Sequence, residues 1–549
     1  MSAKPHRTLS DKKYDSIIKK LELKKELPTK KKFIVIQIDS LPYSILEKFF
    51  KSDSCKFMKH LVEKEGYIFQ RYNCGVPSGT PAVQSGIMYG DNSMIPGFRF
   101  VDKKSKQVIS CGNPLHVEQL ETKYFSKKKG ILEHGSSYSN HFSGGAGRSI
   151  LTMSTMTKTK RFKRIKEADI WFILLLNPVS ALRTLYYTLA EFTIETAEVL
   201  TYPIFRVLGK KKKGIYGAWV PFRRIFLDAI LTEIITTAVL LDIRREVPKI
   251  YINYLNYDDM AHMRGPNSTA AYFALRALDR RIKKLCKKAG DKYDIFIMSD
   301  HGHVEGVPFE EINGMTLAEY ISKCTKVESF GLSSAFEGRL STARLVMNKT
   351  IDFLSYVSTP LRWIVSKFAY GVLRVVRPKK YPFSWEDKEQ IFVSDSCCLA
   401  NVYFNVSEER MDIKEINKKY PKLIDKLLTN KSIGIIMVKD GDGFALLHRS
   451  GKINVAQSVN KEGKDFLGAY GDEKLLIEQL TEYNKVRFLG DLVLFGDYSD
   501  GVAVSFAQHV GAHGGIGGDM MWPFFISKKK YDFSGVTNAR ELHKIFSKY

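Results

Sequence analysis

Several aspartate and histidine residues of this sequence stand at spacings that suit a metal ion. Asp258 and His262 are four positions apart, so one helical turn would place carboxylate and imidazole on one side. Asp300 and His301 are neighbours, and a tight turn could direct both at the same ion. His513 lies among glycines, which let the backbone approach an ion or a ligand closely. Carboxylates and imidazoles together are the ligands of zinc and similar metals.

The elements that must position these residues are short apolar strands. The segments 33–39, 249–258 and 293–300 are apolar and each ends in an aspartate, the first in Asp39. Such runs are typical of buried parallel strands. In a doubly wound α/β sheet, ligands bind beyond the carboxyl ends of the strands, so the three aspartates are expected to converge in one crevice. Any one of these residues alone could be structural, but their joint pattern favours a metal site.

A nucleophile is available in segment 74–86, where Ser78 and Thr80 lie in a turn that leads into a helix. The structural alternative is helix capping, because Ser or Thr before Pro is a common start of a helix. Both roles are compatible, since backbone N–H groups at a helix start also bind phosphoryl oxygens. A hydroxyl at this position could be activated by a metal ion near neutral pH.

With these motifs in place, the chain resembles the alkaline-phosphatase superfamily, especially its type I phosphodiesterase/nucleotide pyrophosphatase branch. Residues 257–266 match Tyr-Asp-x-x-x-His-x-x-Gly-Pro, residues 299–302 match Ser-Asp-His-Gly, and residues 511–514 match Gly-x-His-Gly. Thr80 precedes Gly90 by ten positions, the interval between nucleophile and Thr-Gly pair in that branch, which favours Thr80 over Ser78. The fold implied is α/β, with an alkaline-phosphatase-like, mostly parallel sheet flanked by helices.

The resemblance also implies a mechanism with two divalent metal ions, zinc first, with manganese or iron as alternatives. Thr80 would attack phosphorus in line and form a covalent phospho-threonine, which water then hydrolyses. One ion would be held by Asp39, Thr80, Asp300 and His301, and the other by Asp258, His262 and His513. The branch usually has a phosphate-binding asparagine where this chain reads 96–102; Arg99 could replace it with a cationic contact. A surface role for Arg99 is the alternative.

The resulting hypothesis is a metal-dependent phosphoric ester hydrolase acting on phosphodiesters, with phosphate esters as its partners. The alternatives are a phosphomonoesterase or phosphotransferase of the same superfamily, or a catalytically silent protein that binds membrane surfaces. The third alternative depends on the net charge of +26 and on basic helical segments, which favour contact with anionic membranes. No nucleic-acid-binding module is recognisable, so specific binding of nucleic acid is not expected.

The chain is expected to comprise a polar basic arm (1–32) and a catalytic domain (33–549). The domain would carry a helical insert at about 151–246 and an α+β insert at about 387–470. A further basic amphipathic segment spans 360–377. We expect no signal peptide, because the first 32 residues lack an apolar core, and no transmembrane helix, because no run of 18 apolar residues occurs. The seven cysteines lack disulfide-like spacing, which predicts a cytoplasmic protein, with peripheral membrane contact as an option.

Overall fold

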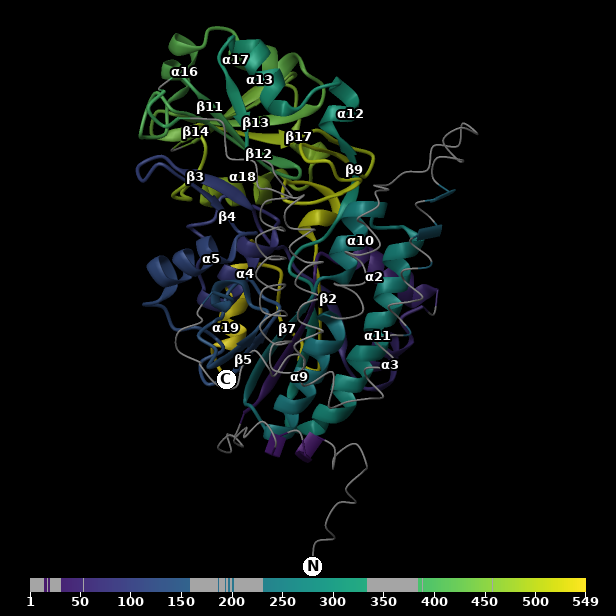
Figure 1. Cartoon of the computed structure of the whole chain (residues 1–549). Coiled ribbons are helices and arrows are strands. Elements are labelled where there is room, and N and C mark those ends of the chain that lie inside the picture. The colour runs from purple at the N-terminus through teal and green to yellow at the C-terminus, as the bar shows by residue number, and fades with distance from the viewer. Residues whose placement is uncertain are drawn as a thin grey trace, which may run out of the picture.

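A computed structural model describes most of the chain, and two large sheets organise it (Figure 1). The described residues are 31–52, 54–157, 231–332, 384–387, 389–456 and 458–549, with a few positions within 14–19 and 186–201. Most of the predicted arm 1–32, most of the predicted helical insert 151–246, and the basic segment 360–377 therefore lie outside the described residues.

The first sheet is mostly parallel and contains the strands predicted from the sequence. Its order is β2-β21-β8-β1-β7-β5-β6. The parallel strands are β1 (Phe33–Ile38), β7 (Lys249–Tyr254), β8 (Asp294–Met298), β5 (Ser136–Tyr138) and β6 (Arg148–Ile150). The antiparallel edge consists of β21 (Phe524–Ser527) and β2 (Ile68–Arg71). Strand β1 is wholly buried between β7 and β8, as its unbroken apolar sequence requires.

Helices cover both faces of this sheet. One face packs against α2 (Tyr43–Lys51), α3 (Lys56–Lys64), α9 (Thr232–Arg245), α10 (Asn256–Arg264) and α11 (Thr269–Ala289). The other packs against α4 (Thr80–Tyr89), α5 (Pro114–Leu120) and α19 (His543–Phe546). Side chains of β1 alternate between the two cores: Ile34 and Ile36 belong to the first, Phe33 and Val35 to the second. The predicted α/β class, a mostly parallel sheet flanked by helices, is confirmed.

The second sheet is antiparallel except for one pair of strands, and has the order β10-β11-β12-β17-β13-β14-β15-β16. Its strands are β10 (Ser329–Gly331), β11 (Ile391–Ser396), β12 (Leu399–Phe404), β17 (Leu492–Gly496), β13 (Ile433–Asp440), β14 (Gly443–His448), β15 (Gly451–Val455) and β16 (Val459–Gly463). It draws strands from both sides of 387–470, so the predicted insert is part of a larger unit. The division into domains stays a proposal.

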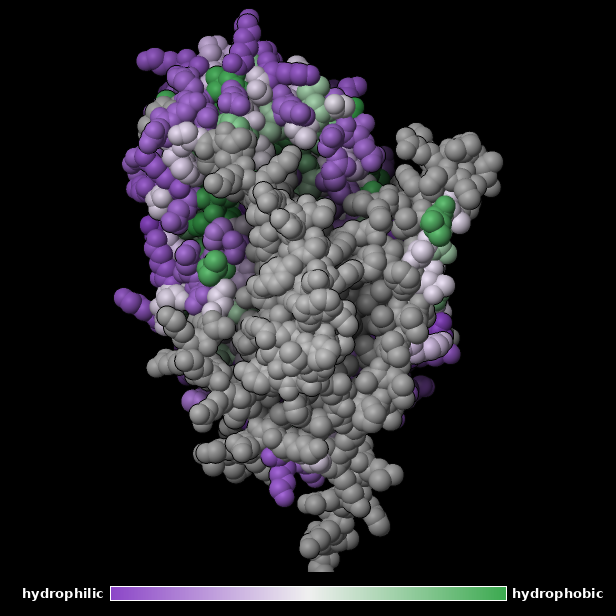
Figure 2. Space-filling model, viewed as in Figure 1, coloured by the Kyte–Doolittle hydropathy of each residue, from purple (hydrophilic) through white to green (hydrophobic). Residues whose placement is uncertain are grey.

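Helices also pack on the second sheet. One face carries α12 (Phe309–Asn313), α13 (Leu317–Thr325), α16 (Ile413–Lys419) and α17 (Leu423–Thr429), and the other carries α18 (Glu473–Asn484). Figure 2 shows that the surface of this region is predominantly hydrophilic on the face viewed. Among the described residues, no helix combines the length and the apolar character needed to cross a bilayer.

Two small sheets lie beside the large ones. Four short strands, β18 (Tyr498–Ser499), β19 (Val502–Ser505), β9 (Val304–Pro308) and β20 (Gly511–Ala512), pair in that order. Strand β9 begins shortly after His301, and β20 immediately precedes His513. The antiparallel pairing of β20 with β9 therefore brings the histidines of two distant motifs close together. A separate hairpin joins β3 (Arg99–Asp102) and β4 (Gln107–Ser110).

Candidate active site

The carboxyl ends of the three central strands meet at one edge of the first sheet. Asp39 follows β1, and its N–H donates to the carbonyl oxygen of Tyr254 at the end of β7 (3.0 Å). Asp300 follows β8, and its Oδ1 accepts the N–H of Ser40 (3.1 Å). Asp258 lies in α10, which begins directly after β7. The convergence of the aspartates follows from the parallel register, because neighbouring parallel strands end at the same edge.

Four side chains meet around the Thr80 hydroxyl; we call them the first ligand group: Asp39, Thr80, Asp300 and His301. Thr80 Oγ1 donates to Asp39 Oδ1 at 3.1 Å and lies 3.1 Å from His301 Nε2. His301 Nε2 lies 3.4 Å from Asp300 Oδ2 and 3.8 Å from Asp39 Oδ1. Thr80 is the first residue of α4, so the amino end of that helix points into the group.

Three further side chains form the second ligand group: Asp258, His262 and His513. His262 Nε2 lies 3.4 Å from Asp258 Oδ1 and 3.1 Å from His513 Nε2. His513 Nε2 lies 3.6 Å from the same carboxylate oxygen. Asp258 and His262 share one side of α10 through their four-residue spacing. The groups adjoin, because the rings of His301 and His513 stack with centroids 4.1 Å apart.

Backbone carbonyls orient all three imidazoles. The Nδ1 atoms of His262, His301 and His513 each lie 3.0 Å from a carbonyl oxygen, of Gly511, Gly302 and Ser78 respectively. A carbonyl oxygen can only accept, so Nδ1 carries the hydrogen and Nε2 presents a lone pair to the ligand group. Gly511 must be glycine for this contact, because a Cβ there would collide with a backbone carbonyl of α10.

The donor sets fit divalent metal ions. With His262 Nε2 and His513 Nε2 both unprotonated, two lone pairs face each other at 3.1 Å, which is repulsive unless a cation lies between them. A tetrahedral ion with bonds of ~2.0–2.1 Å separates its ligands by roughly 3.3–3.4 Å, close to the distances in both groups. Asp300 Oδ2 is buried and accepts no hydrogen bond from any residue that the structure describes. These groups could therefore hold metal ions.

Burial sets the protonation of these side chains when no cation is bound. Burial, reinforced by the charges of Asp300 and Asp258, raises the pKa of Asp39 well above its usual range. Burial raises the pKa of Asp300 to about 7. The same desolvation lowers the pKa of His301, and lowers the pKa of His513 to about 4, so both imidazoles remain neutral near pH 7. A nearby cation reverses the effect on the carboxyls, because it favours their ionised form.

The two candidate hydroxyls differ in what they contact. Ser78 Oγ donates to the carbonyl oxygen of Gly515 (2.9 Å) and accepts the N–H of Gly514 (3.1 Å). Ser78 is fully buried and ties the α4 turn to the His513 loop, while Thr80 Oγ1 faces the first ligand group. This arrangement favours Thr80 as the nucleophile.

Arg99 is the first residue of β3 and is buried. The guanidinium carbon of Arg99 lies 5.6 Å from the centroid of the Phe98 ring. The backbone N–H of Arg99 donates to Ser396 Oγ, with the nitrogen 3.5 Å from the oxygen. A contact of Arg99 with phosphate stays a prediction.

Three residues near the two groups were not singled out by the sequence, and a fourth, His303, was a candidate only for supporting the ligands from just beyond the Asp-His pair. Asn253, in β7, donates to Asp39 Oδ2 at 2.7 Å and so fixes that carboxylate. His303 is buried, with Nδ1 2.9 Å from Ser40 Oγ and 3.7 Å from Asp258 Oδ1. Cys397 Sγ lies 3.9 Å from His262 Nδ1 and 3.0 Å from His509 Nδ1. The position of His303 just after Asp-His-Gly was a signal, but Asn253, Cys397 and His509 belong to no motif.

Comparison with known proteins identifies the family. Residues 33–344 match the profile of the family "Type I phosphodiesterase / nucleotide pyrophosphatase". The chain therefore belongs to this family, and the resemblance inferred from its motifs is confirmed. Its members are phosphoester hydrolases, which places this chain in that class of enzyme. No curated protein matches the sequence significantly.

Solved structures with a similar arrangement are distant in sequence. Phosphonoacetate hydrolase from Sinorhizobium meliloti 1021 is 11% identical, with 94% of this chain and 95% of that chain covered and a TM-score of 0.47. Murine ectonucleotide pyrophosphatase/phosphodiesterase 5 is 10% identical, with 94% of each chain covered and a TM-score of 0.42.

Proposed function

We propose that this chain is a metal-dependent phosphodiesterase that acts through a covalent phospho-threonine formed on Thr80. The observation that carries the proposal is the position of Thr80 Oγ1, 3.1 Å from both Asp39 Oδ1 and His301 Nε2 at the start of α4. A hydroxyl held in this way lies beside a donor set that suits a divalent cation. Membership of the phosphodiesterase family supports the same chemistry.

The two ligand groups would each hold one divalent ion, with zinc favoured and manganese or iron as alternatives. When bound, such ions supply Lewis-acid stabilisation of phosphoryl oxygens and favour the ionised forms of hydroxyl and water. The histidines contribute neutral Nε2 atoms, and their Nδ1–H bonds to backbone carbonyls hold the rings in place. Asn253 holds Asp39 in the same manner.

In the first half-reaction, Thr80 Oγ1 forms a bond to phosphorus while the bond from phosphorus to the leaving oxygen breaks. The hydroxyl proton of Thr80 points at Asp39 Oδ1, so a group that can accept it is already in contact. The amino end of α4 directs its dipole at the incoming phosphoryl group and stabilises negative charge there. In the second half-reaction, water attacks phosphorus and the bond to Thr80 Oγ1 breaks, which restores the hydroxyl.

The proposal is tested with bis-p-nitrophenyl phosphate beside p-nitrophenyl phosphate, using zinc-loaded and EDTA-stripped protein. We expect metal-dependent turnover, faster with the diester. A preference for the monoester would instead assign the protein as a phosphomonoesterase. Acid quenching during turnover, followed by peptide mass spectrometry, should show one phosphoryl group on Thr80.

Two substitutions at Thr80 distinguish the effect of the hydroxyl oxygen from the effect of side-chain volume. Thr80→Val keeps the volume of the side chain and removes its oxygen, so turnover should fall by on the order of 10⁴-fold or more. Thr80→Ser keeps the oxygen and should retain measurable turnover together with the covalent intermediate. Equal activity in Thr80→Val and the parent protein, with metal bound in both, would exclude Thr80 as the nucleophile.

A further inference from the structure

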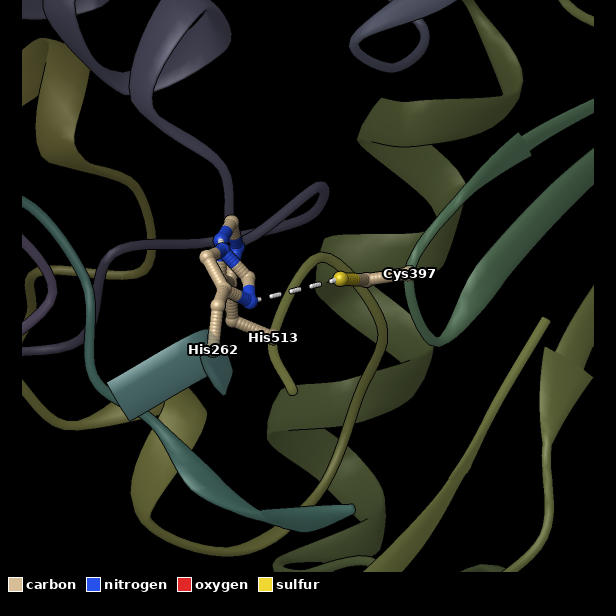
Figure 3. Close-up of side chains that lie close together, drawn as sticks. All are labelled: His262, Cys397 and His513. Atoms are coloured by element: carbon tan, nitrogen blue, oxygen red, sulfur yellow. Dashed lines mark hydrogen bonds between the residues drawn. The ribbon is translucent and has the colours of Figure 1, made fainter. Parts of the chain in front are cut away.

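A thiol and an imidazole, of Cys397 and His509, lie next to the ring of His262, with the thiol closest to the Nδ1 atom of that ring. Cys397 occupies the tight turn between β11 and β12 of the second sheet, and its Sγ lies 3.0 Å from His509 Nδ1. The same sulfur lies 3.9 Å from His262 Nδ1. Figure 3 shows the side chain of Cys397 pointing toward His262 and His513. The second sheet therefore contributes a soft metal ligand to the neighbourhood of the active site.

His262 separates two sets of donor atoms. Its Nε2 faces Asp258 and His513, as described above. Its Nδ1 lies between the carbonyl oxygen of Gly511 and Cys397 Sγ. The rings of His262 and His509 lie 4.3 Å apart at 38°, so both imidazoles border the sulfur. The thiol borders the second ligand group, because its sulfur lies within 4.8 Å of ligand atoms of both His262 and His513.

We propose that Cys397 and His509, with His262 Nδ1 as a third donor, form an additional site for a soft divalent metal ion, and that its occupation inhibits the enzyme. An ion with bonds of ~2.3 Å to sulfur and ~2.0 Å to nitrogen separates these ligands by roughly 3.5 Å. The observed Sγ–Nδ1 distances of 3.0 and 3.9 Å lie on either side of that value. Thiolate and imidazole together select zinc or cadmium over magnesium or calcium.

The same geometry determines how an ion reaches this site and which protons its binding releases. Cys397 is buried, whereas His509 is partly exposed and gives the ion a route from solvent. Binding forms a bond from the metal to Cys397 Sγ and releases the thiol proton to water, so the oxidation states of sulfur and metal do not change. If His262 Nδ1 also binds, it releases its proton to water and loses its hydrogen bond to the Gly511 carbonyl.

Inhibition follows because His262 is common to both sites. Without the bond to Gly511, the ring of His262 is no longer held with Nε2 toward Asp258 and His513. A second positive charge beside the second ligand group also opposes binding of the ion proposed there. The inhibitory effect rests on the proposed hydrolase function, whereas binding of the soft ion does not.

The test is a titration of the metal-loaded protein with Cd²⁺, in buffer free of thiol reductant. The absorption band of thiolate-to-cadmium charge transfer reports a Cd²⁺ ion bound to a thiolate. His509→Asn distinguishes this site from a Cd²⁺ held by Cys397 with His262 and His513, whose ligand atoms also lie within 4.8 Å of one another, because only the proposed site should lose its band in that variant. We expect one band-forming Cd²⁺ per chain in the parent protein, and loss of that band in Cys397→Ser. Cys398→Ser is the matched control, since Cys398 is the adjacent buried thiol and should leave the band unchanged.

Hydrolysis of bis-p-nitrophenyl phosphate is followed in parallel. The parent protein and Cys398→Ser should lose at least tenfold in turnover at Cd²⁺ concentrations that saturate the band. Cys397→Ser and His509→Asn should start from the activity of the parent protein and resist this inhibition. A full band in Cys397→Ser, or no band in the parent protein, overturns the site. A saturated band without inhibition overturns the inhibitory role, and a band in a protein that never turns over either ester rejects the proposed function alone.

Discussion

The two ligand groups differ in burial and in donor chemistry, although they lie side by side. In the first group, the side chains of Asp39, Asp300 and His301 are 0–1% exposed. In the second, the side chain of Asp258 is 22% exposed and that of His513 is 15% exposed. The first group is oxygen-rich and built into the edge of the sheet, whereas the second is rich in imidazole and partly exposed. Solvent therefore reaches Asp258 and His513 more easily than it reaches Asp39, Asp300 and His301.

The pKa values of the carboxyl groups also differ between the two ligand groups. Burial and the mutual repulsion of carboxylates raise the pKa of Asp39 and Asp300. Burial acts on Asp258 as well, but His513 and His303 outweigh it and lower the pKa of that carboxyl. The carboxyl groups of the first group therefore need a cation before they ionise readily, whereas the carboxyl of Asp258 ionises more easily than a free one.

The largest expected effect comes from removing one carboxylate from either group. Asp39→Asn and Asp258→Asn should each lower turnover by on the order of 10⁴-fold and reduce bound metal from two ions per chain to one. Atomic emission after dialysis measures the metal content. Asp279→Asn is the control: Asp279 is a buried carboxylate outside both groups that accepts the N–H groups of Phe57 and Met58. Two ions retained in Asp39→Asn would remove that residue from the first group.

A second test distinguishes the two groups by pH. Metal binding requires ionised carboxylates, so protons compete most strongly where the pKa is raised. As pH falls below about 7, the value to which burial raises the pKa of Asp300, affinity at the first group should drop by at least about tenfold per pH unit. The second group should hold its ion to lower pH, because the pKa of Asp258 is lowered and that of His513 is about 4. Metal content measured between about pH 8 and pH 5 should pass through one ion per chain; loss of both ions together contradicts this order.

A smaller effect is expected on the stability of the metal-free protein, through the protonation of Asp300. Asp300 binds its proton more tightly in the folded chain than in the unfolded one, so without metal the free energy of unfolding should decrease as pH rises from about 4 to 7. Asp300→Asn removes that charge and should raise the Tm of EDTA-stripped protein at about pH 8 by on the order of 5 °C. With metal bound, the same substitution should lower the Tm. Identical Tm values for stripped variant and parent protein at pH 8 would show that Asp300 carries no net charge there.

The three central strands of the first sheet and the convergence of Asp39, Asp258 and Asp300 could be predicted from the sequence, because both follow local rules. An apolar run ending in aspartate predicts a buried strand, and parallel pairing brings strand ends together regardless of the distance between them in sequence. The second sheet was predicted less completely: the α+β insert at about 387–470 was recognised, but not the pairing of β12 with β17, which lies beyond it in the sequence. Cys397 reaches His262 through that long-range packing, so no spacing in the chain could have revealed it.

The smallest expected effect concerns His303, which contacts the second group only through its neighbours. Its Nδ1 lies 2.9 Å from Ser40 Oγ and 3.7 Å from Asp258 Oδ1, so the ring can steady the carboxylate. Asparagine places a polar atom where Nδ1 stands, and glutamine places one nearer the position of Nε2. His303→Gln should therefore weaken metal binding at the second group by about 10- to 100-fold, while His303→Asn retains most of it. Metal titration of both variants measures this directly. Equal losses in the two variants would show that the bulk of the ring matters rather than its contact with Ser40.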